Sequence, residues 1–173
     1  MSDTNFHETL GVDIGGVIID RSNDNTDTSF FSDNYLSIPP VTGAFEALRR
    51  LSNERFGARI YLVSKCGPRI QAKTLAWLKH RNFYNKTGIA PENVLFCRER
   101  HEKAIICRKT HITHFIDDRL EVLGYLRTVK NLYVFRPNPD EVKHFAKFLD
   151  RVHIVNTWEE VLVKFLPNSP RLT

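Results

Sequence analysis

The sequence predicts an α/β fold, a three-layer Rossmann-like sandwich in which helices cover both faces of a mainly parallel central sheet. Short apolar segments rich in β-branched residues alternate with amphipathic segments along almost the whole chain. Such alternation favours helical crossovers, which bring the carboxyl ends of the strands to one edge of the sheet. The chain has 173 residues, of which 42% are hydrophobic and 26% charged, and these values are typical of one globular domain.

The amino-terminal half supplies three strands and two helices. An apolar strand ends at Asp13, and a polar stretch follows it over residues 21–35. The apolar segment 59–63 predicts a second strand, which ends at Ser64. Pro68 then opens a helix, because proline suits the first turn of a helix. The elements expected here are strands at 11–13, 59–63 and 93–97 and helices at 45–51 and 68–78.

The carboxyl-terminal half continues the alternation. Thr157 followed by Glu160 is a capping-box pattern, which predicts the start of the last helix. The elements expected here are strands at 112–116, 132–135 and 152–155, helices at 102–109, 120–126 and 142–149, and a final helix from 157. We expect residues 1–166 to form a single domain with a short flap at about residues 20–40, and residues 167–173 to be a flexible tail.

Polar residues stand where several of these strands end. Asp13 is followed closely by Gly15-Gly16, and Ser64 and the pair Asp117-Asp118 end two other strands. A carboxylate at the end of a buried strand is costly unless a cation or donor lies nearby, and glycines allow the backbone to turn sharply beside a ligand. We expect these residues to converge on the carboxyl edge of the sheet, where α/β proteins commonly bind ligands.

The order of these residues resembles the four motifs of the haloacid dehalogenase (HAD) superfamily. The matching segments are Asp13-x-x-Gly16-Val17, Ser64 after an apolar strand, Lys103, and Phe115-Ile116-Asp117-Asp118. The resemblance covers roughly residues 8–136. Each motif is short, and the specificity comes from finding all four in order on the expected elements. Lys109 competes for the lysine position, but it lies too near Asp117 in the sequence for its side chain to arrive from the preceding helix.

The resemblance implies phosphoryl transfer through an aspartyl-phosphate. Asp13 would be the nucleophile, which divides a difficult hydrolysis into two easier steps. Ser64 would hydrogen-bond a phosphoryl oxygen, and Lys103 would neutralise charge on Asp13 and on the phosphate. Residues expected to help bind the phosphorylated substrate are Gly16, Lys65 and Arg119.

The resemblance also implies a Mg²⁺ cofactor. A carboxylate oxygen of Asp13, the backbone carbonyl of Gly15 and the side chain of Asp117 would hold the ion, and Asp118 would ligate it or order a bound water. Oxygen ligands of this kind are those that Mg²⁺ prefers. Without cations, carboxylates this close together would repel one another, and at least one would tend to take up a proton.

Gly15 departs from the pattern of the superfamily. Phosphatases of this superfamily usually have a second aspartate two residues after the nucleophile, which protonates the leaving oxygen and then activates water. Loss of a positioned acid–base group typically lowers a rate by ~10²–10⁴-fold. We therefore expect the metal and phosphate sites to persist and turnover to be slow or specialised. Candidate substitutes for the missing acid are Asp20, Asp24, Asp27 and His101.

Three functions remain open at this point. The first is a Mg²⁺-dependent phosphohydrolase or phosphotransferase that acts on a phosphorylated small molecule or macromolecule through an open site without a large cap. The second is a catalytically inactive HAD-like module that binds a phospholigand or a protein and retains the metal site. The third is nucleic-acid binding, which the net charge of +5 supports only weakly. The basic residues expected near the carboxyl edge are Lys65, Arg69, Arg98, Arg100 and Arg119.

The remaining residues favour structural roles. Cys66, Cys97 and Cys107 are an odd number of cysteines without a zinc-binding spacing, which predicts free thiols in a reducing, cytoplasmic compartment. No apolar run approaches the ~20 residues needed to span a bilayer, so no membrane partner is expected. Trp77 and Trp158 lie on expected helices and are interpreted as core residues. Cys107, His111 and His114 are interpreted as core or surface residues and not as metal ligands.

Overall fold

A six-stranded sheet forms the middle layer of the protein. The computed structural model describes residues 7–21 and 32–169. The strand order is β3-β2-β1-β4-β5-β6, and every neighbouring pair is parallel. The strands are β1 (Leu10–Val12), β2 (Ile60–Lys65), β3 (Val94–Cys97), β4 (His114–Asp117), β5 (Asn131–Phe135) and β6 (Val152–Val155). The predicted α/β class with a parallel central sheet is confirmed.

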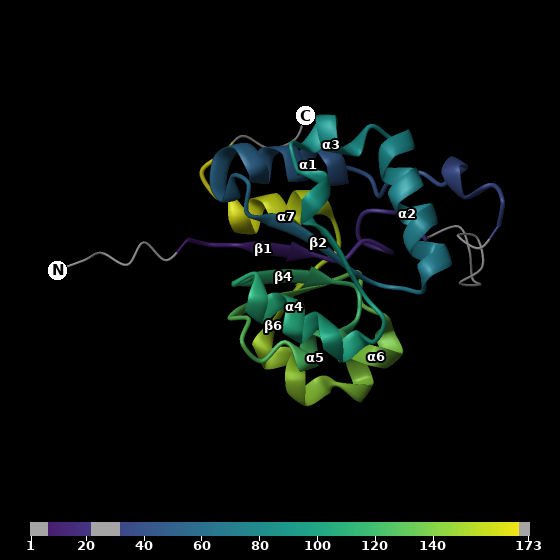
Figure 1. Ribbon diagram of the computed structural model, residues 1–173. Coiled ribbons are helices and arrows are strands. Elements are labelled where there is room, and N and C mark those ends of the chain that lie inside the picture. The colour runs from purple at the N-terminus through teal and green to yellow at the C-terminus, as the bar shows by residue number, and fades with distance from the viewer. Residues whose placement is uncertain (1–6, 22–31, 170–173) are drawn as a thin grey trace.

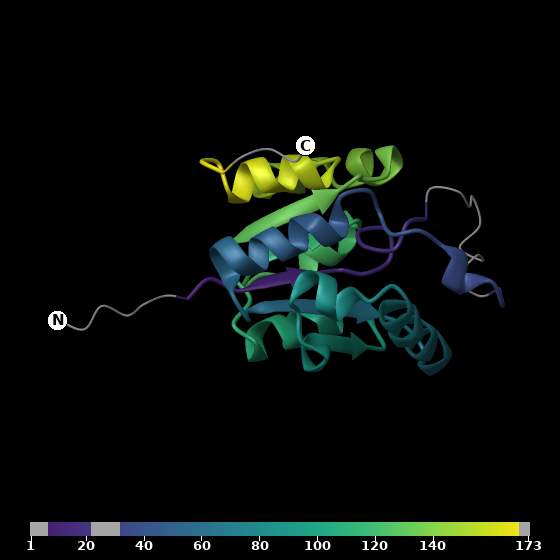
Figure 2. The same cartoon turned by 90° about the horizontal axis from the view of Figure 1, so that it is seen from above.

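Helices cover both faces of this sheet, as Figures 1 and 2 show. One face carries α1 (Ala44–Leu51), α2 (Pro68–His80), α3 (Phe83–Thr87) and α7 (Trp158–Phe165). The other face carries α4 (Lys103–Lys109), α5 (Leu120–Tyr125) and α6 (Pro139–His144). Each face buries its own apolar cluster, as expected for a sheet that is covered on both sides.

Both tryptophans belong to the larger of these clusters. Trp77 and Trp158 are fully buried. Their indole N–H groups donate to the carbonyls of Ile38 and Val17, at 2.9 and 2.8 Å. These bonds satisfy the polar edge of each ring inside the core. The interpretation of both tryptophans as core residues is confirmed.

Some predicted boundaries are corrected by local hydrogen bonding. The single helix expected over 142–149 is instead α6, which starts at Pro139, and a separate 3₁₀ segment over Ala146–Arg151. Asn138 fixes the earlier start, because its side chain accepts a hydrogen bond from the Asp140 amide at 2.8 Å. The strand expected at 112–116 is β4, which begins at His114 and extends through Asp117.

The sheet order determines where a ligand site can form. From β1 the chain proceeds to β2 and β3 on one side and to β4, β5 and β6 on the other. The direction of winding therefore reverses between β1 and β4. Open parallel sheets bind ligands beyond the carboxyl ends of the strands at such a reversal. Asp13 and Asp117 stand at the carboxyl ends of these two strands.

The stem of the expected flap is a pair of short segments that hydrogen-bond to each other. The Asp20 amide donates to the Pro39 carbonyl at 3.0 Å, and the Val41 amide donates to the Ile18 carbonyl at 2.8 Å. A 3₁₀ turn at Tyr35–Ser37 lies beyond the arrowhead of β1 in both views (Figures 1 and 2). Residues 22–31 of the expected flap lie outside the described part of the chain.

Candidate functional site

Strand register brings the first two aspartates to the same level of the sheet. Val12 pairs with Ile116 across β1 and β4, and the Asp13 amide donates to the Ile116 carbonyl at 2.9 Å. Asp13, which is the next residue after Val12, therefore stands beside Asp117. Asp118 follows directly where β4 ends. Acidic ligand atoms of Asp13, Asp117 and Asp118 all lie within 4.8 Å of one another.

Lys103 bridges two of these carboxylates from the first turn of α4. Its Nζ lies 2.8 Å from Asp13 Oδ1 and 2.8 Å from Asp117 Oδ2. The lysine side chain is only 2% exposed. Burial alone disfavours a charged amine, but the attraction of Asp117 and Asp13 outweighs it and raises the pKa of Lys103 above its ordinary value. The predicted choice of Lys103 over Lys109 is the one that this geometry supports.

The carboxylates carry more negative charge than one lysine balances. Burial raises the pKa of Asp117 to about 6, with Lys103 opposing this effect and Asp13 adding to it. Burial also raises the pKa of Asp118 to about 8, and repulsion from Asp13 and Asp117 adds to the effect. An ordinary aspartate titrates near 4. A bound cation would relieve this repulsion and lower both pKa values.

The donor set fits an oxygen-liganded divalent cation. Lys103 engages Asp13 Oδ1, and the Arg119 amide donates to Asp117 Oδ1 at 3.0 Å. These bonds orient both carboxylates, and one ligand oxygen of each of the three aspartates remains within 4.8 Å of the others. Hard, charged oxygen atoms suit cations such as Mg²⁺, Ca²⁺ or Mn²⁺ better than they suit softer metals. Within the described residues, this is the one cluster of acidic, histidine or cysteine side chains close enough to hold a metal.

The turn after β1 holds Gly16 against the third aspartate. The Ile14 carbonyl accepts from the amides of Ile18 and Ile19, at 2.8 and 3.0 Å, which closes the turn. Gly16 has φ of 79°, and a Cβ at this position would lie 2.6 Å from Asp118 Oδ2. The Gly16 amide donates to the Ile19 carbonyl at 2.9 Å. A glycine is therefore required here both for its conformation and for the close approach of a carboxylate.

Arg21 is the site residue that the sequence prediction missed. A Cβ built on Gly15 would lie 2.1 Å from Nη2 of Arg21 and 2.7 Å from its Cζ. The guanidinium therefore lies directly against the Cα of Gly15. It also interacts with Asp118, whose pKa it lowers against the dominant effect of burial. The position of Arg21 just after the glycine turn was the available signal, but residues 21–35 carry no periodicity that orients a side chain.

The other predicted substrate residues lie at the same edge of the sheet. Ser64 and Lys65 are the last two residues of β2, and Ser64 is half-buried while Lys65 is exposed. Because Val12 pairs with Leu62, Ser64 lies one residue beyond the level of Asp13. Arg119 is half-buried and precedes α5. Of the three residues, Arg119 is the one with a shown effect on the cluster, because its charge lowers the pKa of Asp118 against the dominant effect of burial.

Part of the predicted basic rim is engaged inside the protein. Arg100 Nη1 lies 2.6 Å from Glu121 Oε2. Arg98 donates to the carbonyl of Cys66 and to the side chain of Gln71. The Arg100–Glu121 ion pair offsets one positive charge of this rim, whereas Arg98 bonds to neutral groups and keeps its charge.

None of the predicted substitutes for the missing acid is shown to occupy that role. Asp20 is half-buried, and its amide is part of the flap stem. His101 is exposed and packs edge-on against Tyr125, with ring centroids 6.4 Å apart. Asp24 and Asp27 lie outside the described residues.

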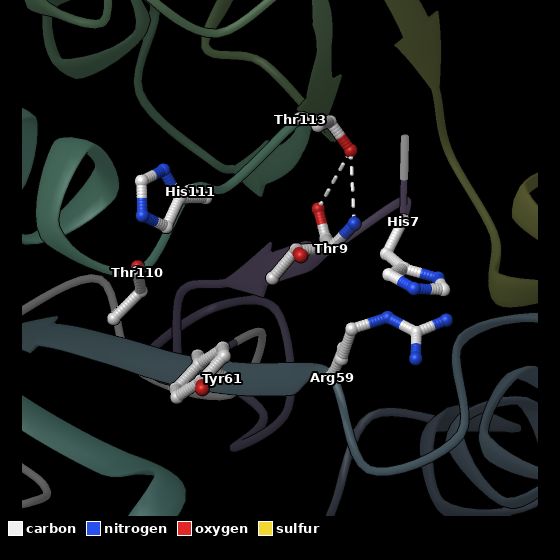
Figure 3. Close-up of a pocket in the computed structure, with 7 residues that line it drawn as sticks. All are labelled: His7, Thr9, Arg59, Tyr61, Thr110, His111 and Thr113. Carbon is white, nitrogen blue, oxygen red and sulfur yellow. Dashed lines mark hydrogen bonds between the residues drawn. The ribbon is translucent and has the colours of Figure 1, made fainter. Parts of the chain in front are cut away.

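A separate pocket lies at the opposite edge of the sheet. Its lining residues are His7, Thr9, Arg59, Tyr61, Thr110, His111 and Thr113. Figure 3 shows that the Thr113 hydroxyl faces the backbone of Thr9, from whose amide it accepts and to whose carbonyl it donates, at 2.9 and 3.1 Å. Thr9, Arg59 and Thr113 come just before β1, β2 and β4. The pocket therefore lies at the amino-terminal ends of these strands, away from the aspartates at the carboxyl ends.

The residues interpreted as structural keep that role. Cys66, Cys97 and Cys107 are buried and free of disulfides, and burial raises the pKa of the Cys107 thiol to about 12. His114 is buried, and its Nδ1 lies 2.8 Å from the Thr113 hydroxyl. A protonated thiol is a poor nucleophile and a poor metal ligand. Cys107 and His114 are therefore core residues and His111 is a surface residue, as interpreted.

No family model matches the chain, and a search of curated proteins finds no significant match to it. Within residues 7–21 and 32–169, no helix has the length and apolar character needed to cross a membrane.

Proposed function

We propose that the protein is a Mg²⁺-dependent phosphohydrolase or phosphotransferase in which Asp13 carries the phosphoryl group. The observation that supports this proposal best is the buried Lys103 amine, 2.8 Å from both Asp13 and Asp117, at the reversal of strand order. A structural ion pair would need one carboxylate, whereas this site assembles three within 4.8 Å. The order of motifs, which resembles that of the HAD superfamily, supports the same chemistry.

The metal would be held by Asp13, by Asp117 and by the backbone carbonyl of Gly15, and Asp118 would ligate it or order a bound water. When bound, Mg²⁺ would supply positive charge that orients and polarises a phosphoryl oxygen. Its neutralising charge would also keep all three carboxylates ionised at neutral pH.

The side chains of the protein would prepare Asp13 for attack. Lys103 holds Asp13 Oδ1 at 2.8 Å, so the carboxylate is oriented and Oδ2 would be the attacking oxygen. The Asp13 side chain is 11% exposed, which is enough for a phosphoryl group to reach one oxygen while the rest stays buried. Ser64 would hydrogen-bond a second phosphoryl oxygen, and Arg119 and Lys65 would attract the dianion.

A second candidate is a binding module that has lost turnover. Gly15 favours it, because position 15 has no side chain to protonate a leaving group. Such a module would keep the cation and bind a phospholigand or a phosphorylated protein without cleaving it. The two candidates differ in turnover alone, and a rate measurement therefore separates them.

The test is hydrolysis of p-nitrophenyl phosphate with and without Mg²⁺. We expect magnesium-dependent turnover in the wild-type protein and a loss of roughly 10³-fold or more in Asp13→Asn. The matched control is Asp150→Asn, which makes the same change at an exposed aspartate outside the site and should leave the rate unchanged.

Either failure has a defined meaning. Turnover that survives Asp13→Asn contradicts the aspartyl-phosphate. No turnover in the wild-type protein, together with phosphate binding that requires Mg²⁺ and Asp13, identifies the binding module instead.

A further inference from the structure

We propose that Arg21 occupies the space of the missing side chain at position 15 and stabilises the leaving-group oxygen of the substrate. The substrates would then be phosphate donors whose leaving oxygen is a weak base, such as aryl phosphates, acyl phosphates and phosphoanhydrides. This inference rests on the proposed phosphoryl transfer, and it names the substrate class of that site.

The first step is the shared space of positions 15 and 21. Three guanidinium atoms of Arg21 lie within 3.0 Å of the point where a Cβ of residue 15 would stand, and the nearest is Nη2 at 2.1 Å. A side chain at position 15 and the present conformation of Arg21 therefore exclude each other. Because Gly15 has no side chain, the Arg21 guanidinium occupies the space that an acidic side chain at position 15 would otherwise fill.

The second step is the direction from which Arg21 enters the site. The flap stem fixes the backbone just before it, because the Asp20 amide donates to the Pro39 carbonyl at 3.0 Å. From there the guanidinium reaches Gly15 and also interacts with Asp118. Arg21 itself is exposed. A residue that reaches both Gly15 and Asp118 is therefore open to solvent.

The third step is the chemistry of a guanidinium. It remains protonated at physiological pH and donates hydrogen bonds in a fixed plane, but it does not give up a proton. Arg21 can thus stabilise negative charge on a departing oxygen and cannot neutralise it by proton transfer. The missing general acid is replaced by an electrostatic group, and this limits the site to leaving groups that are stable as anions.

The resulting reaction is balanced without an acid. An oxygen of Asp13 donates an electron pair to phosphorus, the bond from phosphorus to the leaving oxygen breaks, and that oxygen departs as an anion beside Arg21. Water then attacks phosphorus, Asp13 recovers its electron pair as a carboxylate, and one proton passes to solvent. In a transferase, an acceptor oxygen would take the place of water.

Substitutions at both positions test the shared space. Arg21→Ala removes the guanidinium, and Gly15→Ala should displace it, because the contacting atoms are the mobile end of a long side chain. The two changes should therefore have similar effects, and the double variant should be no worse than either single one. The matched controls are Arg127→Ala, at an exposed arginine between α5 and β5, and Gly124→Ala, where a Cβ meets open space.

The rate measurement uses a series of aryl phosphates with leaving groups of increasing basicity. Loss of one charge-stabilising donor typically lowers a rate by about 10²–10³-fold. We expect a loss of about 10²-fold in kcat/KM for phenyl phosphate in Arg21→Ala and Gly15→Ala, and a clearly smaller loss for p-nitrophenyl phosphate. A steeper dependence of log kcat/KM on leaving-group pKa is the signature of this role.

A binding measurement gives a readout independent of turnover. Orthovanadate with Mg²⁺ places an oxygen where the leaving oxygen would stand, and calorimetry measures its affinity. We expect Arg21→Ala and Gly15→Ala to weaken vanadate binding by about 10-fold, while Arg127→Ala and Gly124→Ala leave it unchanged. Thermal unfolding checks that each variant is folded.

The outcomes separate this inference from the proposed function. Non-additive losses in vanadate binding with a steeper leaving-group dependence support it. If the wild-type protein turns over aryl phosphates and Arg21→Ala changes neither this turnover nor vanadate binding, the role of Arg21 is contradicted. The proposed phosphoryl transfer is not affected by that result. A wild-type protein that neither turns over aryl phosphates nor binds vanadate overturns both.

Discussion

Lys103 determines the electrostatic balance of the site at the scale of single residues. Its amine is the one cation that an ion-pair distance of 2.8 Å connects to both Asp13 and Asp117 among the described residues. Removing one partner of a buried ion pair leaves charge without compensation in a poorly hydrated place. In the proposed phosphoryl transfer the same amine would also face the charge that develops on the transferred group, so stability and catalysis would both depend on it.

Replacing Lys103 with methionine should destabilise the protein strongly. We expect the free energy of unfolding, measured by urea denaturation at neutral pH, to fall by about 3–5 kcal/mol. Saturating Mg²⁺ should recover part of this loss, because a bound cation supplies the missing charge. Lys109→Met, at an exposed position of the same helix, is the control and should change the free energy by less than about 0.5 kcal/mol. A small effect of Lys103→Met would show that the carboxylates are protonated without it.

Residues that end strands were easier to predict than residues in loops. Asp13, Lys103 and Asp117 could be placed together because parallel strands end at one edge and the first turn of a crossover helix lies close by. Arg21 could not be placed in this way. Its contact with Gly15 depends on the path of an irregular segment, and neither hydropathy nor spacing describes such a path.

The turn after β1 shows at the scale of elements how a short segment controls the site. Gly16 has a positive φ, and the carboxylate of Asp118 lies where its Cβ would be. Because the Gly16 amide is used within the turn, its contribution to a ligand site is its lack of a side chain. The turn therefore determines how closely the Asp118 carboxylate can approach the end of β1.

Gly16→Ala should weaken both the fold and cation binding. A left-handed conformation costs a non-glycine residue about 1–2 kcal/mol, and displacement of Asp118 adds to this cost. Thermal unfolding measures the first effect, and Mg²⁺ titration by calorimetry measures the second. Gly124→Ala provides the comparison, since that position has open space and lies in α5, where alanine is favoured over glycine. Unchanged Mg²⁺ affinity in Gly16→Ala would mean that Asp118 is not a ligand.

Helices with a periodic pattern were predicted, and the shortest helices were not. α2 starts at Pro68 as expected, and the Thr157 side chain accepts from the Glu160 amide at 3.1 Å. The expected capping box is only half formed, because Glu160 accepts from the Asn156 amide instead of that of Thr157. α3 was missed, since its five residues are too few to show helical periodicity.

A histidine buried among aromatic rings affects the stability of the whole molecule. His114 of β4 packs against Phe56, Phe165 and Tyr133. Its Nε2 lies 3.4 Å from Arg55 Nη2 and 3.8 Å from Glu8 Oε1. Burial lowers the pKa of His114 to about 4, with Arg55 adding to this effect and Glu8 opposing it. The ring is therefore neutral at physiological pH, and its contact with Glu8 is not an ion pair there.

This histidine predicts a loss of stability in mild acid. Between about pH 6.5 and pH 4 the unfolded chain binds a proton at His114 that the folded protein does not bind, so the contribution of His114 to the free energy of unfolding falls as the pH falls. The expected loss from this residue over the range is on the order of 2–3 kcal/mol. The raised pKa values of Asp117 and Asp118 act in the opposite direction, so the measurement is urea denaturation of the wild-type protein beside His114→Phe, which keeps an aromatic ring. Relative to this variant the wild-type protein should lose stability as the pH falls, and a difference that does not change with pH would assign the effect to other groups.

The fold was the part of the molecule that the sequence predicted most completely. Parallel strands buried on both faces produce continuous apolar segments, and the intervals between them fit crossovers. Strand order was not predicted, because every interval is compatible with more than one neighbour in the sheet. The order is nevertheless what places Asp13 beside Asp117.

The central position of β1 also determines when the site can exist during protein synthesis. Leu10 of β1 pairs with Ile60 and with His114, which are made long after it. At a translation rate of about 5–20 residues per second, roughly 5–20 seconds pass between the synthesis of Asp13 and that of Asp117. A polypeptide released before β4 is complete therefore contains the first carboxylate of the site without its partners. The first segment of the site to be synthesised is therefore incomplete until a much later segment has been added and has paired with it.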